Sequence, residues 1–260
     1  MTTSPFQELE LAVIEAGEMI VAGADQAVPL PDSADPLNPT TSLDRRVDAF
    51  LHERLLAALE RSVAYLTEER SDDPARLGAR EVLIVDPIDG TRSLLLGRQE
   101  VAVSVALWRE GEVVWGCIYN PFTRDLFAAE AGKGTWHQGK RVRVSEGHDP
   151  ARARVLLSLH EHDRGLLKAL DGRLAYQAVG SIAWKMALVA AGKAEATFTA
   201  FVRHEWDVAA GYLLVREAGG RVTDVAGRDI RFNQADLTVH GLVASNGRLH
   251  EAMMGYVRLL

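Results

Sequence analysis

The sequence is poor in cysteine, with Cys117 as the single thiol among 260 residues. One thiol cannot form an internal disulfide, which excludes a disulfide-stapled scaffold. Cys117 lies in a strand-like apolar run and is expected to be a small buried side chain rather than a nucleophile. Long apolar runs are also lacking, because the first one, Leu11–Ile14, ends at Glu15, far short of the about 20 residues that span a bilayer. We therefore expect a cytoplasmic protein with neither a signal peptide nor a membrane span.

Basic residues are fewer than acidic ones, 29 against 36, and the net charge is −7. This balance excludes a protein that holds a nucleic acid polymer by neutralising its phosphates. An anionic small molecule would also be repelled unless basic side chains or a bound metal neutralised it locally. Hydrophobic residues make up 47% of the chain, which is ample for a folded core.

Hydrophobic periodicity divides the chain into two halves. Ser4, Pro5 and Gln7 form a capping-box-like start to a helix that ends near Gly23, and Pro29–Pro39 reads as a loop before the next helix. We expect an antiparallel meander from Val101 to Val144 and an alternation of strands and helices after Val155. Two lobes are predicted, residues 1–150 and residues 151–260. The predicted helices are 4–23, 44–59, 180–191, 206–219 and one from Gly247, and the predicted strands are 63–66, 82–85, 101–105, 113–119, 126–128, 142–144, 155–157, 196–198 and 221–224.

The most informative motif is Asp86–Thr91, with two carboxylates three residues apart, followed by a glycine and a hydroxyl. The preceding run Val82–Val85 predicts a buried strand that Pro87 stops, so Asp86 would lie at a strand end, where open α/β sheets bind ligands. Gly90 would let the backbone approach an anion closely, and a helix starting near Thr91 would point its free N–H groups at a phosphate. The pattern indicates a metal-phosphate site.

Three other acidic motifs are ambiguous on their own. Glu68 and Glu69 follow a short strand and are typical of a solvated edge. Asp207 is placed at a helix start and Asp44 follows Thr41 at another, where acids commonly serve only as caps.

Taken together, these motifs resemble the inositol monophosphatase superfamily of magnesium-dependent, lithium-sensitive phosphatases. The central signature of that family, acid-Pro-Ile-acid-Gly-Thr after a buried strand, is unchanged at Asp86–Thr91. The other signatures match Glu68-Glu69, Thr41 with Asp44, Trp206–Gly211 and Glu217–Gly220. The chain departs from the pattern at Asn38, where an aspartate is common, and at Ala200, where animal inositol monophosphatases have a glutamate that grips inositol.

The resemblance implies an α/β fold, a layered α/β/α/β/α sandwich, with the site between the layers. It also implies two to three Mg²⁺ ions. Glu68, Asp86 and the Ile88 carbonyl would bind the first ion, and Asp86, Asp89 and Asp207 the second. Thr91, hydrogen-bonded to Asp44, would take a proton from the attacking water, with Glu68 as the third catalytic group. Gly90, Thr91, Ser181 and Asp207 would contact the substrate phosphate.

The substrate implied is a small phosphorylated metabolite. The runs Gly180–Lys185 and Glu205–Gly211 look more like bacterial 3′(2′),5′-bisphosphate nucleotidases, which favours 3′-phosphoadenosine 5′-phosphate. Lys185 or Arg203 would contact its second phosphate, and Trp184, Phe201 or Tyr212 its adenine. The alternatives are an inositol-1-phosphate or sugar phosphate phosphatase, and a non-catalytic homologue that binds metal and phosphate. Homodimers are common among similar proteins, so a homodimer is a further expectation.

Overall fold

The computed structural model describes residues 5–30, 39–59 and 62–260. Ser4 and Asn38 therefore lie outside the described residues, as does most of the predicted loop. The described helices are α1 (Pro5–Gly23), α2 (Ser42–Leu59), α3 (Thr91–Leu95), α4 (Leu159–Asp163), α5 (Ile182–Ala190), α6 (Glu205–Glu217) and α7 (His250–Val257). None of them combines the length and the hydropathy of a membrane span.

The first sheet runs in the order β1-β2-β3-β4-β5-β6-β7. Its strands are β1 (Ala64–Thr67), β2 (Glu81–Asp89), β3 (Ala102–Arg109), β4 (Glu112–Asn120), β5 (Asp125–Glu130), β6 (Gly134–His137) and β7 (Lys140–Val142). The meander predicted from Val101, which is β3 to β7, is antiparallel, and β2 also pairs antiparallel with β3, but β1 pairs in parallel with β2. The sheet is therefore mixed, because the chain returns from β1 to β2 through a crossover instead of a hairpin.

The second sheet runs in the order β11-β12-β10-β8-β9. Its strands are β8 (Val155–Ser158), β9 (Gln177–Val179), β10 (Ala196–His204), β11 (Arg221–Thr223) and β12 (Thr238–Ser245). Strand β10 pairs in parallel with β8 and antiparallel with β12, so this sheet is mixed as well. The sequence did not predict β9, β12 or α4, nor β6 in the first sheet, where Gly134 was interpreted as a turn.

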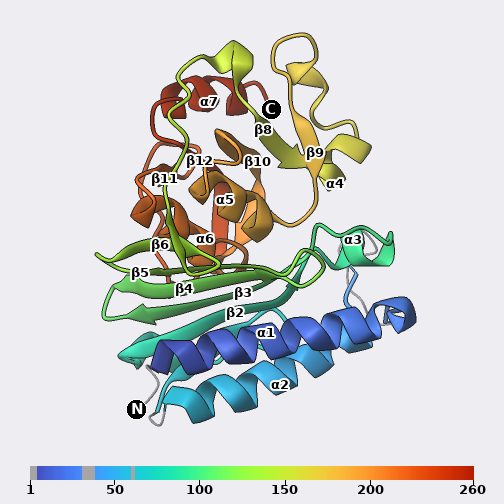
Figure 1. The fold of residues 1–260 in the computed structure, drawn as a ribbon, viewed down its shortest axis with the longest axis vertical. Coiled ribbons are helices and arrows are strands. Elements are labelled where there is room, and N and C mark those ends of the chain that lie inside the picture. The colour runs from blue at the N-terminus through green and yellow to red at the C-terminus, as the bar shows by residue number, and fades with distance from the viewer. Residues whose placement is uncertain (1–4, 31–38, 60–61) are drawn as a thin grey trace.

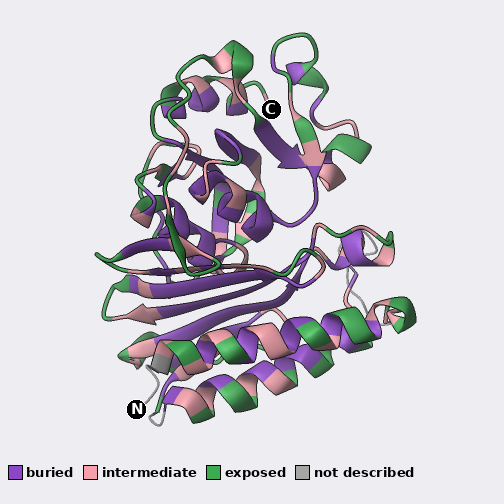
Figure 2. Cartoon of the chain, viewed as in Figure 1, coloured by how far each residue is buried: buried purple, intermediate pink, exposed green. Residues whose placement is uncertain are grey.

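The layers alternate as the resemblance implied (Figure 1): α1 and α2, the first sheet, α5 and α6, the second sheet, and α7. Helix α2 buries Val47, Leu51, Leu55 and Leu59 at four-residue spacing, in one apolar cluster with a face of the first sheet. A second cluster joins the other face of that sheet to α5, α6 and the second sheet. Figure 2 shows the central strands buried, whereas the outer surfaces of α1 and α2 are exposed. Since one core spans both sheets, the division near residue 150 stays a prediction.

Strand β2 continues through the motif instead of stopping at Pro87. Its ladder with β3 is regular up to Asp86, shifts register, and resumes at Asp89. Proline has no N–H to donate, so the ladder is irregular at Pro87, as at a bulge. The irregularity places Asp86 and Asp89 at the end of a rigid, buried strand.

Candidate active site

A cavity of about 300 Å³ lies where strand ends meet helix starts. It is lined by the ends of β2, β8 and β10 and by the first residues of α3, α4 and α5, with Asp207 from the first turn of α6. Carboxyl ends of strands and amino ends of helices are where α/β folds bind ligands. The cavity therefore occupies the position that the sequence predicted for the site.

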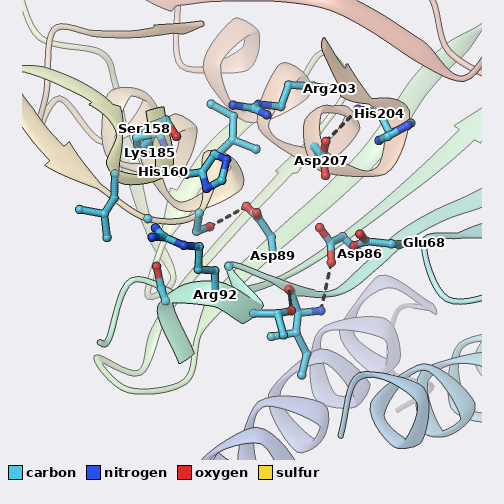
Figure 3. A pocket seen from close by; sticks show the side chains of 18 of the residues that line it. Glu68, Asp86, Asp89, Arg92, Ser158, His160, Lys185, Arg203, His204 and Asp207 are labelled. Carbon is cyan, nitrogen blue, oxygen red and sulfur yellow. Dashed lines mark hydrogen bonds between the residues drawn. The ribbon is translucent and has the colours of Figure 1, made fainter. Parts of the chain in front are cut away.

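Three aspartates come together in this cavity (Figure 3). Asp86, Asp89 and Asp207 each offer a carboxylate oxygen, and these oxygens lie within 4.8 Å of one another. The family resemblance implied this convergence of motifs that lie far apart in the chain. Glu68 lines the same cavity from the end of β1 but is not a member of the close triad.

Hydrogen bonds orient the aspartates. Oδ2 of Asp89 accepts bonds from Ser181 Oγ and from the Ala183 N–H, both at 2.6 Å. Oδ2 of Asp207 accepts a bond from the His204 N–H at 2.8 Å. A carboxylate has two oxygens, so these bonds fix the side chains and leave lone pairs for a cation.

The buried carboxylates of the cavity repel one another electrostatically. Burial raises the pKa of Asp86 well above its usual range, and the carboxylate of Glu68 raises it further. Burial, with a contribution from Asp207, raises the pKa of Asp89 to about 6. Burial and the carboxylate of Asp207 likewise raise the pKa of Glu68 well above its usual range. A divalent cation would relieve this repulsion, and a set of carboxylate oxygens suits a hard ion such as Mg²⁺.

Thr91 and Asp44 form the predicted pair. Thr91 Oγ1 lies 2.6 Å from Asp44 Oδ1 and 3.0 Å from the Ile88 carbonyl oxygen. The other oxygen of Asp44 accepts bonds from the N–H and the hydroxyl of Thr41. The pair is held rigidly, because Asp44 and Thr91 are both buried.

Gly90 is required by the backbone between the aspartates and Thr91. Its φ is +104°, and a Cβ at this position would lie 2.8 Å from the Glu100 carbonyl oxygen. Only glycine adopts this conformation without strain. The helix that follows, α3, has five residues, so the predicted helix start at Thr91 is confirmed while the helix itself is short.

The polar substrate contacts predicted from the sequence line the cavity, whereas the aromatic ones do not. Ser181, Lys185 and Arg203 are among its lining residues. Trp184 instead packs edge-on against Phe127 in the core, and Tyr212 packs edge-on against Phe232. Phe201 does not line the cavity either. The prediction that Trp184 or Tyr212 contacts adenine is wrong, because tertiary packing uses both rings as core, and the prediction for Phe201 stays a prediction.

Arg92 and His160 are two of the cavity-lining residues that were not among the predicted site residues. Arg92 directly follows the central motif and lines the cavity, and its place next to Thr91 is a signal that could have identified it. His160 also lines the cavity but sits in a helix too short to show periodicity. Ala200, at the position of the inositol-gripping glutamate, packs against the apolar cluster of the second sheet.

Comparisons with known proteins agree with this geometry. The model of the inositol monophosphatase family matches residues 5–259. The inositol-1-monophosphatase of Rhizobium meliloti is 34% identical over 228 residues, covering 83% of this chain and 84% of that protein. The putative Nus factor SuhB of Neisseria meningitidis serogroup B is 30% identical over 252 residues and covers 94% of each chain.

A solved structure shows the same fold. The IMPase of Thermotoga maritima superposes with a TM-score of 0.85 at 24% sequence identity, covering 96% of this chain and 94% of that one. The family match extends over nearly the whole sequence and includes every element that lines the cavity. The chain therefore belongs to the inositol monophosphatase family of metal-dependent phosphoric monoester hydrolases.

Proposed function

We propose that this protein hydrolyses the phosphate monoester of a small polyol, an inositol or sugar phosphate, with Mg²⁺ as its cofactor. The observation that carries the proposal is the convergence of Asp86, Asp89 and Asp207 beside the buried Thr91–Asp44 pair. Relatives named inositol-1-monophosphatase support a polyol phosphate. 3′-Phosphoadenosine 5′-phosphate has less support, since two of the three rings assigned to its adenine, Trp184 and Tyr212, are buried in the core.

The acidic residues would hold the metal. Asp86, Asp89 and Asp207 supply the close triad, and Glu68 with the Ile88 carbonyl extends the set toward the two to three ions that the family resemblance implies. When bound, the metal lowers the pKa of a water molecule and stabilises negative charge on the phosphate. Ser181 and Ala183 keep Asp89 in place through their hydrogen bonds.

Thr91 and Asp44 would move the proton. Because the Thr91 hydroxyl donates its own hydrogen to Asp44, the lone pairs on Oγ1 can accept a proton from an attacking water. Burial raises the pKa of Asp44 above the ordinary value of an aspartate, which makes its carboxylate a stronger base. Water attacks phosphorus, the ester P–O bond breaks, and the products are an alcohol and inorganic phosphate.

The test is phosphate release from inositol 1-phosphate, fructose 1,6-bisphosphate and 3′-phosphoadenosine 5′-phosphate, with Mg²⁺ and with added Li⁺. We expect Mg²⁺-dependent release that is fastest with a polyol ester and is inhibited by Li⁺. Release from none of the three by folded protein would refute the proposal and favour the non-catalytic homologue.

Thr91→Ala tests the proton transfer separately. General-base catalysis is worth about 10²- to 10⁴-fold, so kcat should fall by that factor while the Mg²⁺-induced rise in Tm persists. Thr91→Ser keeps the hydroxyl and should restore most of the rate. An alanine variant that turns over like the wild type would contradict the role of this pair.

A further inference from the structure

Helix α2 buries a second carboxylate, Asp48, which has no part in the site as described so far. Asp48 follows Asp44 by four residues, and the two side chains are 2% and 3% exposed, respectively. Residues four apart lie on one face of a helix. On this face Asp44 is hydrogen-bonded to Thr91, and Asp48 is hydrogen-bonded to the end of β1. One face of α2 therefore contacts both the central motif and the strand that leads to Glu68.

The hydrogen bonds of Asp48 reach the chain on both sides of Glu68. Its Oδ1 accepts bonds from Thr67 Oγ1 at 2.9 Å and from the Tyr65 hydroxyl at 3.1 Å, both in β1. Its Oδ2 accepts a bond from Arg70 Nε, just after the turn that follows β1. Both oxygens of this carboxylate are thus occupied by donors from the segment 65–70. Asp48 fixes the residues before and after Glu68.

Strand pairing alone does not hold the backbone at Glu68. Strand β1 lies at the edge of the first sheet and pairs only with β2. The last pair of this ladder joins Thr67 to Val85, the residues that precede Glu68 and Asp86. Figure 3 shows Glu68 and Asp86 beside each other in the cavity. Since the ladder ends before Glu68, the position of Glu68 depends on what holds the turn.

The hydroxyl of Thr67 connects Asp48 to the turn itself. Thr67 is 3% exposed, and its Oγ1 donates to Asp48 and accepts a longer bond of 3.4 Å from the Glu69 N–H. Threonine hydroxyls stabilise turns by bonding to the backbone two residues on. Arg70 joins the other side of the turn to Asp48. The turn that carries Glu68 is therefore tied to α2 at both ends.

We propose that Asp48 is a positioning residue, which through Thr67 and Arg70 fixes the turn that presents Glu68 to the metal. The inference rests on the proposed function, in which Glu68 extends the set of metal ligands beyond the aspartate triad. It also gives α2 a second role, because the helix that carries Asp44 sets the place of Glu68 as well. Groups that orient metal ligands in this way are typically worth about 10- to 100-fold in metal affinity.

The experiment measures Mn²⁺ binding without substrate, from the electron paramagnetic resonance signal of free Mn²⁺. In Asp48→Leu one of the bound ions should be held about 10- to 100-fold more weakly, whereas an ion held by the aspartate triad should keep its affinity. The Mg²⁺ concentration that gives half-maximal phosphate release should rise by the same factor. Replacing a buried charge by an apolar side chain is often tolerated, and Arg70, at 42% exposure, can remain solvated.

Milder variants keep the inference testable if Asp48→Leu does not fold. Thr67→Val keeps the shape of the side chain but loses the hydroxyl, so Mn²⁺ binding should weaken in the same way by a smaller factor. Thr67→Ser keeps the hydroxyl and should bind as the wild type does. Arg54→Met is the matched control, because Arg54 is another α2 residue in a partly exposed ion pair, with Glu15 of α1, and its Mn²⁺ affinity should be unchanged.

A double-mutant cycle asks whether Asp48 acts through Glu68. Glu68→Gln removes the carboxylate that the turn presents, so adding Asp48→Leu to this variant should weaken Mn²⁺ binding no further. An equal loss of affinity in both backgrounds would overturn the positioning role. A lower Tm of Asp48→Leu with unchanged Mn²⁺ affinity would likewise overturn it, because that result is expected of a purely structural carboxylate.

The outcomes separate this inference from the proposed function. Wild-type Mn²⁺ affinity in folded Thr67→Val and Asp48→Leu would overturn the role of Asp48 and leave the proposed function intact. Failure of the wild type to bind Mn²⁺ would refute the metal site, and with it both the proposed function and the inference that rests on it.

Discussion

Two buried groups of charged side chains meet at the first turn of α6 and are neutralised in opposite ways. Asp207 belongs to the aspartate triad, whereas Glu205, two residues earlier, belongs to a network around Arg76. Both groups bury carboxylates and both receive hydrogen bonds, but only the second contains an arginine that is hydrogen-bonded within the group. The comparison separates acids that need an external cation from acids that do not.

The Arg76 network is satisfied by the protein itself. Arg76, on the 3₁₀ helix η2 (Pro74–Gly78), is 2% exposed and donates to Asp72, to Asn233 Oδ1 at 2.7 Å and to the Gln234 carbonyl at 2.8 Å. Glu205 accepts bonds from the N–H groups of Asn233 and Gln234 at 2.6 and 2.8 Å. These bonds join the segment that follows Glu68 to the start of α6, so the network stabilises the frame around the site.

The triad lacks such a set of donors. Its members receive hydrogen bonds from the N–H of Ile88 and from Ser181, Ala183 and His204, but each of Asp86 and Asp89 also faces other carboxylates. Like charges that are buried together persist only if protons or a cation compensate them. The triad is therefore suited to bind a cation, whereas the Arg76 network stabilises the fold.

Removing a triad carboxylate should give the largest effect. In Asp89→Asn the amide oxygen can still accept bonds from Ser181 and Ala183, so the fold should persist. A metal contributes several kcal/mol to the transition state, so kcat/KM should fall by about 10³-fold or more. The metal-free Tm should stay equal or rise, since one repelling charge is gone. Phosphate release measures kcat/KM, and thermal melts in EDTA measure the metal-free Tm. A variant that lost stability but kept its rate would show that Asp89 serves the fold rather than the reaction.

Breaking the Arg76 network should act on stability instead. Arg76→Met takes the donor away from Asp72, from Asn233 Oδ1 and from the Gln234 carbonyl, and leaving buried acceptors unsatisfied costs about 1 to 3 kcal/mol. Urea unfolding measures this loss. At a temperature where Arg76→Met is folded, it should bind Mg²⁺ with nearly the affinity of the wild type. Asp89→Asn should bind Mg²⁺ more weakly than either. A variant that kept full stability would show that the network is not structural.

The pH dependence of stability should show the repulsion within the aspartate triad directly. Folding raises the pKa of Asp89 from 3.8 to about 6, so the protonated form is favoured in the folded state. The contribution of protonated Asp89 to the free energy of unfolding is therefore fully present below about pH 4, and it is lost as the pH rises through 6. In EDTA, the Tm of the wild type should therefore fall relative to that of Asp89→Asn between pH 4 and 7, and saturating Mg²⁺ should abolish the fall. Parallel pH profiles of the two proteins in EDTA would contradict the repulsion.

The exposed pair of Arg80 and Glu110 should give the smallest effect. Its side chains are 85% and 55% exposed, so water screens their attraction. Arg80→Met should leave both the Tm and kcat/KM unchanged within error. A clear loss of either would mean that surface charge, rather than buried charge, governs this protein.

The acidic side of the cavity could be predicted from the sequence because each of its motifs is local and conformationally restricted. Asp86 and Asp89 follow a continuous buried strand, and Gly90 is required by a positive φ. The Thr91–Asp44 hydrogen bond was also predicted and is present at 2.6 Å. Their meeting with Asp207 followed from the resemblance, since periodicity alone does not say which strand ends face one another.

The remaining features depend on contacts between distant segments. Glu161 lies in the five-residue helix α4 and reads as a solvated acid until Thr199 and Arg203 bury it. Strand β12 contains Gly241 at φ +67°, which interrupts the pattern of a strand. Trp184 has an aromatic ring of the kind that often contacts a ligand, yet it packs against Phe127. In each case the partner, and not the local sequence, decides the role.

The most direct test of the central claim is a crystal soaked in Mn²⁺ and measured at the manganese absorption edge. The account predicts an anomalous peak about 2.1 Å from carboxylate oxygens of Asp86, Asp89 and Asp207, the distance at which small hard divalent ions bind oxygen. The peak should vanish in Asp89→Asn or move away from residue 89. Mn²⁺-dependent phosphate release from crystals that show no peak among these three aspartates would contradict it.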